Sequence, residues 1–176
     1  IRAANPYSIS KVGHDLMSQY YYNAYGMKIV ITRMFSHEGA RRGREFALSS
    51  FANQIAKGEK SGSYIVKHGN LDSIRTYNHI DDAIEAYWLC SESDKYGEVY
   101  NIGGDETCTV GDALDMLIAR SDKDFVKVLD QDRVRPTDIT LQIPDSSKFK
   151  NDFGWMSKKG LKEICDDLLK YWRDVV

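Results

Sequence analysis

The sequence predicts a single α/β domain, and three observations lead to this class. Short runs of β-branched and apolar residues alternate with longer segments in which apolar residues recur every three or four positions. The chain has 176 residues, which is enough to bury one core but too few for two full domains. No internal repeat, low-complexity segment or flexible linker divides it.

The first half of the chain contains two helix patterns and two strand patterns. Pro6 suits the first turn of the first helix, and Gly26 suits its end. Gly58 is expected to end the second helix, and the strands read as buried strands of a parallel sheet. In order, we expect a helix over residues 7–25, a strand over 28–35, a helix over 46–57 and a strand over 63–67.

The second half repeats the alternation. Asp81 or Asp82 is expected to cap the third helix and Thr109 the fourth, while Gly154 ends a short fifth helix. Residues 130–144 read mostly as a loop. In order, we expect a helix over residues 81–90, a strand over 99–102, a helix over 109–118, a strand over 125–129, and helices over 146–154 and 159–175.

Composition and charge exclude several classes of protein. A formal net charge of −2 gives no general attraction to nucleic acid, and no apolar run approaches the length of a membrane span. Cys90, Cys108 and Cys165 are odd in number and widely spaced, which predicts buried, reduced thiols and no disulfide framework. The histidines show no ligand spacing with Cys or carboxylates, so we expect no metal. The expected location is cytoplasmic.

Tyr7 and Lys11 are the first candidates for chemistry. Positions four apart lie one above the other on a helix, so the two side chains share a face near a helix start. A free phenol has a pKa of roughly 10, and a neighbouring ammonium favours the phenolate. Such a pair can serve as a general acid or base. The alternative is an exposed Lys beside a half-buried Tyr, a spacing that helices often carry by chance.

Five arginines fall in expected loops or at loop edges, namely Arg41, Arg42, Arg75, Arg133 and Arg135. Loops after strands are where α/β domains bind ligands, and the guanidinium fork matches phosphate oxygens. If these side chains converge, they form an anion site for a diphosphate. The alternative is a set of scattered surface charges or structural ion pairs.

Two further patterns each have two readings. Tyr20, Tyr21 and Tyr22 make the first helix aromatic nearly all round, which fits a subunit interface and simple core burial equally well. Gly103 and Gly104 follow a strand but lack the Gly-x-Gly-x-x-Gly spacing. We therefore expect a turn there and not a pyrophosphate cradle.

Several motifs resemble those of one enzyme family, in the family's order along the whole chain. Residues 5–11 (Asn-Pro-Tyr-Ser-Ile-Ser-Lys) look like the Tyr-x-x-x-Lys helix of the extended short-chain dehydrogenases that remodel nucleotide sugars. Residues 36–46 (Ser-His-Glu-Gly-Ala-Arg-Arg-Gly-Arg-Glu-Phe) resemble the Asn-His-Glu-Ser-Pro-Arg-Arg-Gly-x-x-Phe loop of GDP-mannose 4,6-dehydratases. Residues 69–75 are similar to the same family's Gly-Asn-Leu-Asp-Ser-x-Arg. Motifs shared more widely, including with GDP-4-keto-6-deoxymannose reductases, lie at residues 97–103, 135–138 and 153–155.

The resemblance implies a fold and an organisation. The chain would be the C-terminal part of an NAD(P)-binding, Rossmann-like extended short-chain dehydrogenase, with the small substrate-binding region. Within residues 1–176, residues 1–35 would end the dinucleotide-binding fold and residues 36–176 would be mainly the sugar-nucleotide-binding region. Because no Met opens the chain and Tyr7 follows almost at once, we expect a fragment with further sequence upstream. We also expect a homodimer or homotetramer.

The resemblance also implies roles for the residues nearest the redox chemistry. Tyr7 matches the catalytic Tyr, and Lys11 matches the Lys that promotes its ionisation and holds the nicotinamide ribose. His37 and Arg42 match positions that contact NADP, and Arg42 would reach a 2′-phosphate, including that of a neighbouring subunit's cofactor. NADP is the expected cofactor, with NAD as the other candidate.

A second set of matches concerns the GDP-sugar substrate. Arg75 and Arg135 match arginines that grip the nucleotide diphosphate, and the segment around Phe46 lies near the base. Ser36 stands where the family has an Asn that helps to hold the diphosphate, so this contact is expected to be lost or mediated by water. Ala40 replaces a loop-stiffening Pro.

The implied reaction is the 4,6-dehydration of GDP-mannose or a GDP-manno-heptose. A hydride passes from sugar C4 to NADP, water is eliminated across C5 and C6, and the hydride returns to C6. The Gly-rich loop and the Thr and Glu upstream of the Tyr are absent from this chain, so we expect the isolated chain to be inactive. The alternatives are a GDP-4-keto-6-deoxymannose reductase or sugar-nucleotide epimerase, and a non-catalytic binding module that kept the fold.

Overall fold

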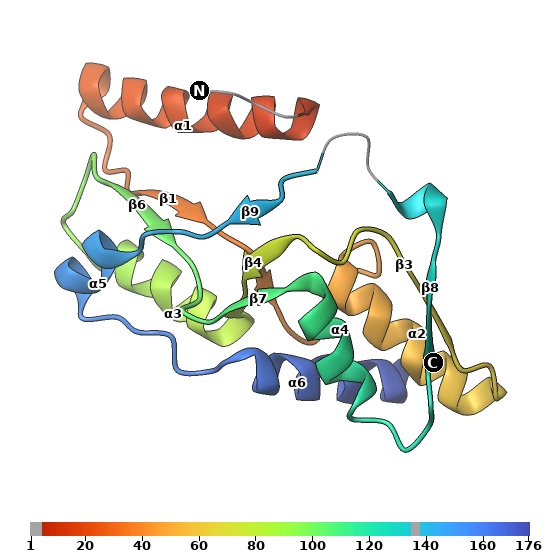
Figure 1. Ribbon diagram of the computed structural model, residues 1–176. Coiled ribbons are helices and arrows are strands. Elements are labelled where there is room, and N and C mark those ends of the chain that lie inside the picture. The colour runs from red at the N-terminus through yellow and green to blue at the C-terminus, as the bar shows by residue number, and fades with distance from the viewer. Residues whose placement is uncertain (1–4, 135–137) are drawn as a thin grey trace.

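The structure is a computed structural model that describes residues 5–134 and 138–176. Figure 1 shows the order of the elements. The helices are α1 (Pro6–Tyr25), α2 (Ala47–Ser61), α3 (Ile80–Ser91), α4 (Val110–Ile118), α5 (Ser147–Phe153) and α6 (Leu161–Val175), with one 3₁₀ turn, η1 (Gln131–Arg133). The strands are β1 (Ile31–Met34), β2 (His37–Glu38), β3 (Ile65–His68), β4 (Ile74–Thr76), β5 (Asn78–His79), β6 (Val99–Ile102), β7 (Thr107–Thr109), β8 (Val126–Leu129) and β9 (Leu141–Gln142).

The strands form small sheets in which parallel pairs dominate. β1 pairs with β6 in parallel, with Ile31 opposite Val99, and β2–β5 and β3–β8 are parallel as well. β4 lies between β7, its antiparallel neighbour, and β9, its parallel neighbour. Parallel strands need a crossover connection, and helices supply it between β1 and β6 and between β3 and β8. The predicted α/β class is therefore confirmed.

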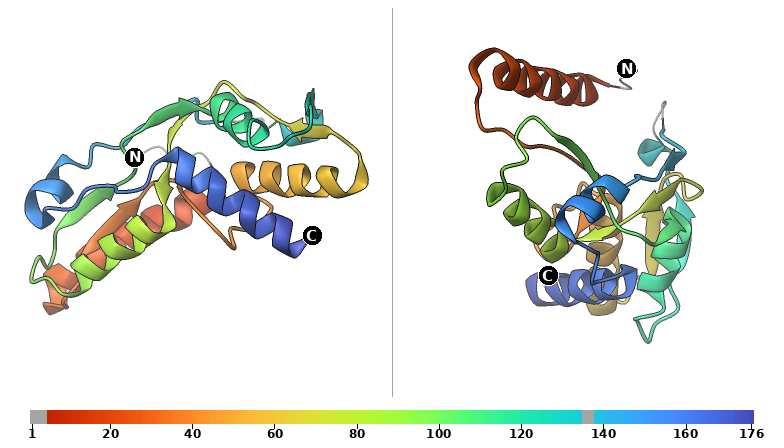
Figure 2. Two further views of the ribbon diagram at one scale, coloured as in Figure 1. Left: turned by 90° about the horizontal axis from the view of Figure 1, so that it is seen from below. Right: turned by 90° about the vertical axis from the view of Figure 1, so that its left-hand side faces the viewer.

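Two clusters of buried side chains hold the body together. The larger one joins α2, α4 and α6 to β3, with Leu48, Leu114 and Leu168 fully buried. The smaller one packs Tyr100 of β6 against Phe149 of α5, with ring centroids 5.5 Å apart. α6 is amphipathic over its whole length, so its apolar stripe faces the larger cluster and its charged face remains in solvent. α6 packs against both α2 and α4, and the left-hand view of Figure 2 shows it running across the lower side of the molecule beside α2.

α1 lies apart from both clusters. It runs along one side of the molecule above β1, as the right-hand view of Figure 2 shows, and none of its residues is buried. Tyr20 is 55% exposed and Tyr21 is 41% exposed, so burial in this chain's own core does not explain these tyrosines. The subunit interface remains a prediction. Among the described residues, no helix combines the length and the apolar character that crossing a bilayer requires.

Two predicted helix ends are wrong, for identifiable reasons. α2 continues through Gly58 to Ser61, and Gly62 in the left-handed conformation ends it. Gly58 serves packing instead, because a Cβ there would lie 2.5 Å from the Ser63 carbonyl oxygen. At α3 the cap is His79, whose Nδ1 accepts the Asp81 backbone N–H at 3.1 Å.

The other differences concern short elements. Thr109 caps α4 as predicted, through a reciprocal pair of bonds with Asp112. The strands β2, β4, β5, β7 and β9 have only two or three residues each, too few for a periodic pattern to indicate. Gly103 and Gly104 lie in the irregular connection between β6 and β7, which has no hydrogen-bonded turn at these two residues. Gly104 is required there, because a Cβ would lie 2.1 Å from the Tyr77 carbonyl oxygen.

Candidate active site

Tyr7 and Lys11 occupy the exposed first turns of α1. Asn5 caps this helix by accepting the Ser8 backbone N–H at 2.8 Å, and Pro6 fills its first position. The Lys11 ammonium lies 5.3 Å from the centroid of the Tyr7 ring, so the two side chains meet as their spacing predicts. Tyr7 is 69% exposed, and a ligand could therefore reach its phenol directly.

A partly exposed ion pair joins α1 to the sheet. The Arg33 guanidinium on β1 donates to both oxygens of Asp15, with Nε–Oδ2 at 2.6 Å and Nη2–Oδ1 at 3.2 Å. The hydrogen bond from Arg33, opposed by partial burial, holds the pKa of Asp15 below its ordinary value. At the far end of the helix the Tyr22 ring packs so closely on Gly97 that a Cβ there would clash with it. These contacts set the direction in which α1 presents Tyr7.

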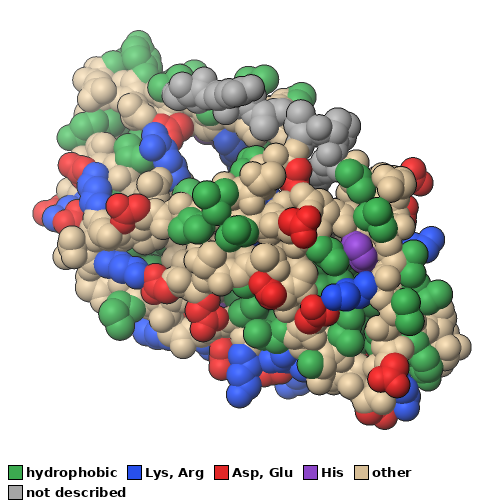
Figure 3. Space-filling model, viewed as in Figure 1, with side chains coloured by type: hydrophobic (Ala, Val, Ile, Leu, Met, Phe, Trp, Pro, Cys, Tyr) green, Lys and Arg blue, Asp and Glu red, His purple; other side chains and the backbone are tan. Residues whose placement is uncertain are grey.

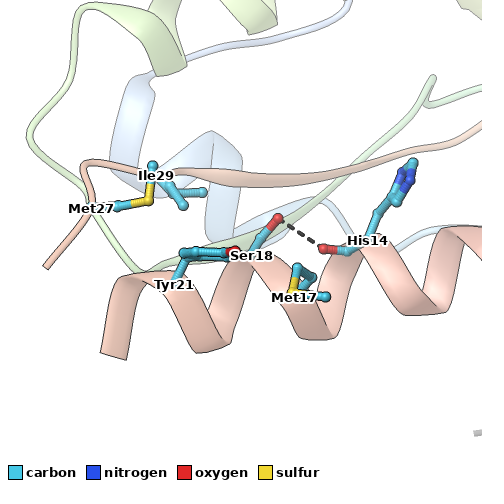
Figure 4. A pocket seen from close by; sticks show the side chains of 6 residues that line it. All are labelled: His14, Met17, Ser18, Tyr21, Met27 and Ile29. Carbon is cyan, nitrogen blue, oxygen red and sulfur yellow. Dashed lines mark hydrogen bonds between the residues drawn. The ribbon is translucent and has the colours of Figure 1, made fainter. Parts of the chain in front are cut away.

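A groove runs along the opposite part of α1. Figure 4 shows the side chains that line this cavity of about 340 Å³, which are His14, Met17, Ser18 and Tyr21 of α1 with Met27 and Ile29 of the segment after it. It begins two turns beyond Tyr7, so it is not the place of the Tyr–Lys pair. Figure 3 shows an opening between the part of the molecule formed by α1 and the body, with basic side chains at its rim.

The loop after β1 carries Ser36 and His37 beside the sheet. The Asn78 backbone N–H donates to the Ser36 carbonyl at 2.9 Å, which continues the pairing of β2 with β5. His37 Nδ1 lies 3.0 Å from the Phe35 carbonyl oxygen. Since a carbonyl only accepts, Nδ1 carries the proton of this bond, and Nε2 is the ring nitrogen left for other contacts.

Arg42 is held in place by its backbone and by an aromatic ring. Its backbone N–H donates to Gly39, and the Ser49 hydroxyl donates to its carbonyl at 2.6 Å. Ser49 also accepts the indole N–H of Trp172 at 2.9 Å, which links the loop to α6. The guanidinium carbon lies 3.4 Å from the centroid of the Phe46 ring, in a stacked cation–π contact. Of the predicted site residues, Arg42 and Phe46 are thus brought together.

Glu38 lies beside Arg42 and was not among the predicted site residues. It is only 5% exposed, and its Oε2 lies 3.6 Å from Arg42 Nε, which is too long for a hydrogen bond. Burial, opposed by the charge of Arg42, raises the pKa of Glu38 to about 7. A cavity of about 180 Å³, lined by residues 37–42 and Ile80, lies beside this pair. The carboxylate is buried because β2 pairs with β5 inside the fold, and the sequence alone does not indicate this pairing.

Arg75 lies in a second polar cluster, around Asp138. Its Nη2 is 3.6 Å from Asp138 Oδ1, and its Nη1 donates to the Ile74 carbonyl at 2.8 Å. Ser73 and Asn70 both donate to Asp138 Oδ2, at 2.6 and 3.1 Å. Burial alone would raise the pKa of Asp138, but these hydrogen bonds and the charge of Arg75 hold it below its ordinary value.

The predicted convergence of the arginines can be judged for those that are described. Arg133 donates to the Ser50 hydroxyl at 3.2 Å. Ser50 lies in the first turn of α2, and its backbone N–H donates to the carbonyl of Phe46, whose ring stacks on Arg42. Two of the arginines therefore share one end of α2, while Arg75 belongs to the Asp138 cluster. Arg135 lies outside the described residues. Within residues 5–134 and 138–176, no group of three His, Cys, Asp or Glu side chains is placed to hold a metal ion.

Comparison with solved structures defines the class of fold. A protein of Pseudomonas aeruginosa named RMD, solved in complex with NADPH, superposes with a TM-score of 0.91 at 21% identity, covering 99% of this chain and 58% of that one. A UDP-glucuronic acid 4-epimerase from Bacillus cereus, in complex with UDP-glucuronic acid and NAD, gives 0.88 at 23% identity, covering 98% and 54%. The fold is that of the NAD(P)-binding, Rossmann-like extended short-chain dehydrogenases.

The sequence narrows this class to one family. The profile described as GDP-mannose 4,6 dehydratase matches residues 1–168, so the chain belongs to that family. GDP-mannose 4,6 dehydratase 1 of Arabidopsis thaliana is 28% identical over 163 residues, covering 91% of this chain and 45% of the relative. The Drosophila melanogaster enzyme is 26% identical over 185 residues, covering 94% and 47%. The chain spans about half the length of these relatives.

Proposed function

We propose that this chain supplies the Tyr–Lys pair and the sugar-nucleotide region of a GDP-mannose 4,6-dehydratase. The substrate is GDP-mannose or a GDP-manno-heptose, and the products are the 4-keto-6-deoxy sugar nucleotide and water. The observation that carries the proposal is the exposed pair on α1, with the Lys11 ammonium 5.3 Å from the Tyr7 ring. Because the chain belongs to this family, we assign to the pair the roles of the family's catalytic Tyr and its neighbouring Lys.

NADP is the cofactor that the donor groups fit, with NAD as the other candidate. Lys11 offers an exposed ammonium for ribose hydroxyls, His37 keeps Nε2 available, and Arg42 offers a fixed guanidinium that suits a phosphate. Relatives of this fold have been solved with NADPH and with NAD. When bound, the nicotinamide supplies reversible hydride transfer, accepting a hydride from sugar C4 and returning it to C6.

The chain's own residues would move protons and hold the sugar nucleotide. The Tyr7 oxygen accepts the proton of the C4 hydroxyl as the 4-keto group forms, and Lys11 stabilises the negative charge of the phenolate. Phe46 would lie near the base and Ser36 near the diphosphate. Arg75 would have to exchange its contact with Asp138 for the diphosphate, because only 14% of its side chain is exposed.

The exposed surface of α1 supports the idea that the chain works with further polypeptide. Apolar side chains such as Leu16, Met17 and Tyr20 are more than half exposed on it. We propose that residues equivalent to the amino-terminal half of the relatives cover this surface and supply the Gly-rich loop, so that the isolated chain is inactive. Residues 1–35 would then end the dinucleotide-binding fold, and residues 36–176 would form the sugar-nucleotide region. A cytoplasmic homodimer or homotetramer completes the proposal.

A reductase is the second candidate, because a GDP-6-deoxy-D-mannose reductase of Pseudomonas aeruginosa is 22% identical and covers 98% of this chain and 57% of the relative. A Glu two residues past the upstream Thr would favour dehydration, because a reductase needs no base at C5. Product analysis separates the two activities. A dehydratase releases water from GDP-mannose, whereas a reductase consumes NADPH on the 4-keto sugar.

The proposal is tested by Tyr7→Phe in the chain joined to its upstream residues. Turnover of GDP-mannose, followed by mass spectrometry, should fall by at least about a thousandfold, because the phenol that exchanges the proton is gone. Affinity for GDP, measured by titration calorimetry, should stay within about twofold, since the ring remains. Retained turnover would remove Tyr7 from the mechanism. Failure of the unmodified protein to bind GDP or NADP would favour a non-catalytic module.

A further inference from the structure

Glu38 and Arg42 form a buried pair that stops short of a hydrogen bond. Glu38 Oε2 and Arg42 Nε are both inaccessible to solvent, and neither has a hydrogen-bond partner among the described residues, although they lie 3.6 Å apart. Buried polar atoms without a partner are rare in folded proteins. The cavity of about 180 Å³ beside them leaves the guanidinium room to move toward or away from the carboxylate.

The remaining contacts of Arg42 leave Glu38 as the group that can reorient it. The backbone of Arg42 is fixed by Gly39 and Ser49, and Phe46 supports one face of the guanidinium plane. The Arg42 side chain is 25% exposed while its Nε is inaccessible, so the exposed area belongs to its other atoms. An inward pull on Nε by Glu38 therefore changes what the guanidinium offers outside.

We propose that Glu38 is a positioning residue for Arg42 and sets how strongly Arg42 binds a phosphate group of a nucleotide, an inference that rests on the proposed function. Ionised Glu38 attracts the guanidinium inward and offsets its positive charge. Protonated Glu38 leaves the full charge available to the anion. Phosphate affinity at Arg42 therefore falls as Glu38 loses its proton.

The charged and titratable groups around Glu38 leave Arg42 as its partner. Tyr77 faces it, and the pKa of Tyr77 is raised chiefly by its own burial and further by the negative charge of Glu38. On β5, His79 is engaged by Asp167 at 3.0 Å and by the Asp81 backbone. On α3, Asp82 accepts backbone N–H groups of residues 158 and 159. With a pKa raised to about 7, Glu38 changes its charge near neutral pH.

The positioning is tested on the chain itself, without ligand. In ¹⁵N-arginine-labelled protein, the Nε–H signal of Arg42, identified by its loss in Arg42→Lys, is followed from pH 5 to pH 9. In the wild type we expect the Arg42 Nε–H signal to shift with a midpoint near pH 7, and in Glu38→Gln we expect it to stay constant. The control is Glu45→Gln, the matched change at an exposed carboxylate of the same loop, and it should behave like the wild type. A signal that titrates identically in Glu38→Gln, or does not titrate in the wild type, overturns the proposal.

A second variant guards against loss of folding in Glu38→Gln. The ¹³C signal of the Glu38 carboxyl should titrate at higher pH in Arg42→Gln than in the wild type, because the opposing charge is removed. An unchanged midpoint would show that the two groups do not interact, and would overturn the proposal as well.

Binding provides the functional readout. In the chain joined to its upstream residues, titration calorimetry at pH 6 and pH 8 should show NADP affinity falling several-fold more in the wild type than in Glu38→Gln. NAD, which lacks the 2′-phosphate, should show no such difference. Titration of the 2′-phosphate itself, with a pKa of about 6 for phosphate monoesters, is common to both proteins and cancels. Equal changes in both proteins overturn the proposal. If the chain joined to its upstream residues binds neither dinucleotide, the proposed cofactor role fails, and the Arg42 signal alone decides the positioning.

Discussion

The stability of the fold should depend on the ionisation of Glu38. Its pKa is raised from 4.5 to about 7 in the folded protein, so the folded state holds a proton that the unfolded state releases. The number of protons bound by the folded state exceeds that of the unfolded state between these values, so the free energy of unfolding decreases as pH rises. The contribution of Glu38 to the free energy of unfolding is fully present below pH 4.5 and is lost as the pH rises through 7.

The size of this effect follows from the two pKa values. A difference of about 2.5 units corresponds to about 3.4 kcal/mol in total, of which about 2.5 kcal/mol is lost between pH 5 and pH 8. Glu38 is only 5% exposed, so solvent screening reduces this figure little. Glu38→Gln keeps the shape of the side chain and removes the titration, so its free energy of unfolding should lack this loss.

Urea denaturation followed by tryptophan fluorescence measures the difference. The free energy of unfolding of the wild type minus that of Glu38→Gln should fall by about 2.5 kcal/mol from pH 5 to pH 8. Histidines and other carboxylates titrate in both proteins and cancel in this difference. Glu45→Gln should show a change below about 0.5 kcal/mol, because that side chain is exposed. If the difference between the wild type and Glu38→Gln changes with pH as little as the difference between the wild type and Glu45→Gln, the Glu38 carboxylate is hydrated. The reasoning from burial would then be refuted.

Two further predictions concern the supports of the site. Arg33→Ala should change the free energy of unfolding by less than about 1 kcal/mol, because Arg33 is half exposed. It should nevertheless speed hydrogen exchange of the α1 amides, because the bond to Asp15 is lost. Unchanged exchange would show that this pair does not hold the helix. Ser49→Ala should cost about 1–3 kcal/mol in urea denaturation, since the partly buried indole N–H of Trp172 and the Arg42 carbonyl both lose their partner. Ser50→Ala is the neighbouring control, and a cost for Ser49→Ala no larger than for this half-buried site would contradict the account.

The long elements could be predicted from the sequence because local patterns encode them. The helix over residues 7–25 and the strand over residues 99–102 were expected within a residue of their observed bounds, since capping residues and apolar runs mark their ends. The predicted end of α2 was wrong because the sequence does not distinguish a glycine that permits close packing from a glycine that ends a helix. Gly58 allows the backbone at Ser63 to pack closely against α2, whereas Gly62 adopts the left-handed conformation that ends the helix. Only the folded structure distinguishes these two roles.

The candidate site divides in the same way. Tyr7 and Lys11 meet because a helix fixes their spacing, so sequence alone places them together. Glu38 acquires its character from a strand of two residues that pairs with β5, forty positions later, and the sequence gives no measure of this burial. Asp138 shows the same limit, because its partners Ser73 and Asn70 come from a distant segment. Charge can be read from a sequence, whereas the loss of water around a charge cannot.

The two arginine sites differ in a way that bears on function. Arg75 already has a carboxylate partner that keeps a lowered pKa and remains charged at neutral pH, so an incoming diphosphate must compete with a permanent negative charge. The carboxylate beside Arg42 changes its charge near neutrality, so competition there depends on pH. With Arg42 at the cofactor phosphate and Arg75 at the substrate diphosphate, as we propose, rising pH weakens the phosphate contact of Arg42 and leaves that of Arg75 unchanged. On the proposed roles, a pH-dependent affinity that Glu38→Gln abolishes is therefore expected for NADP and not for the GDP-sugar.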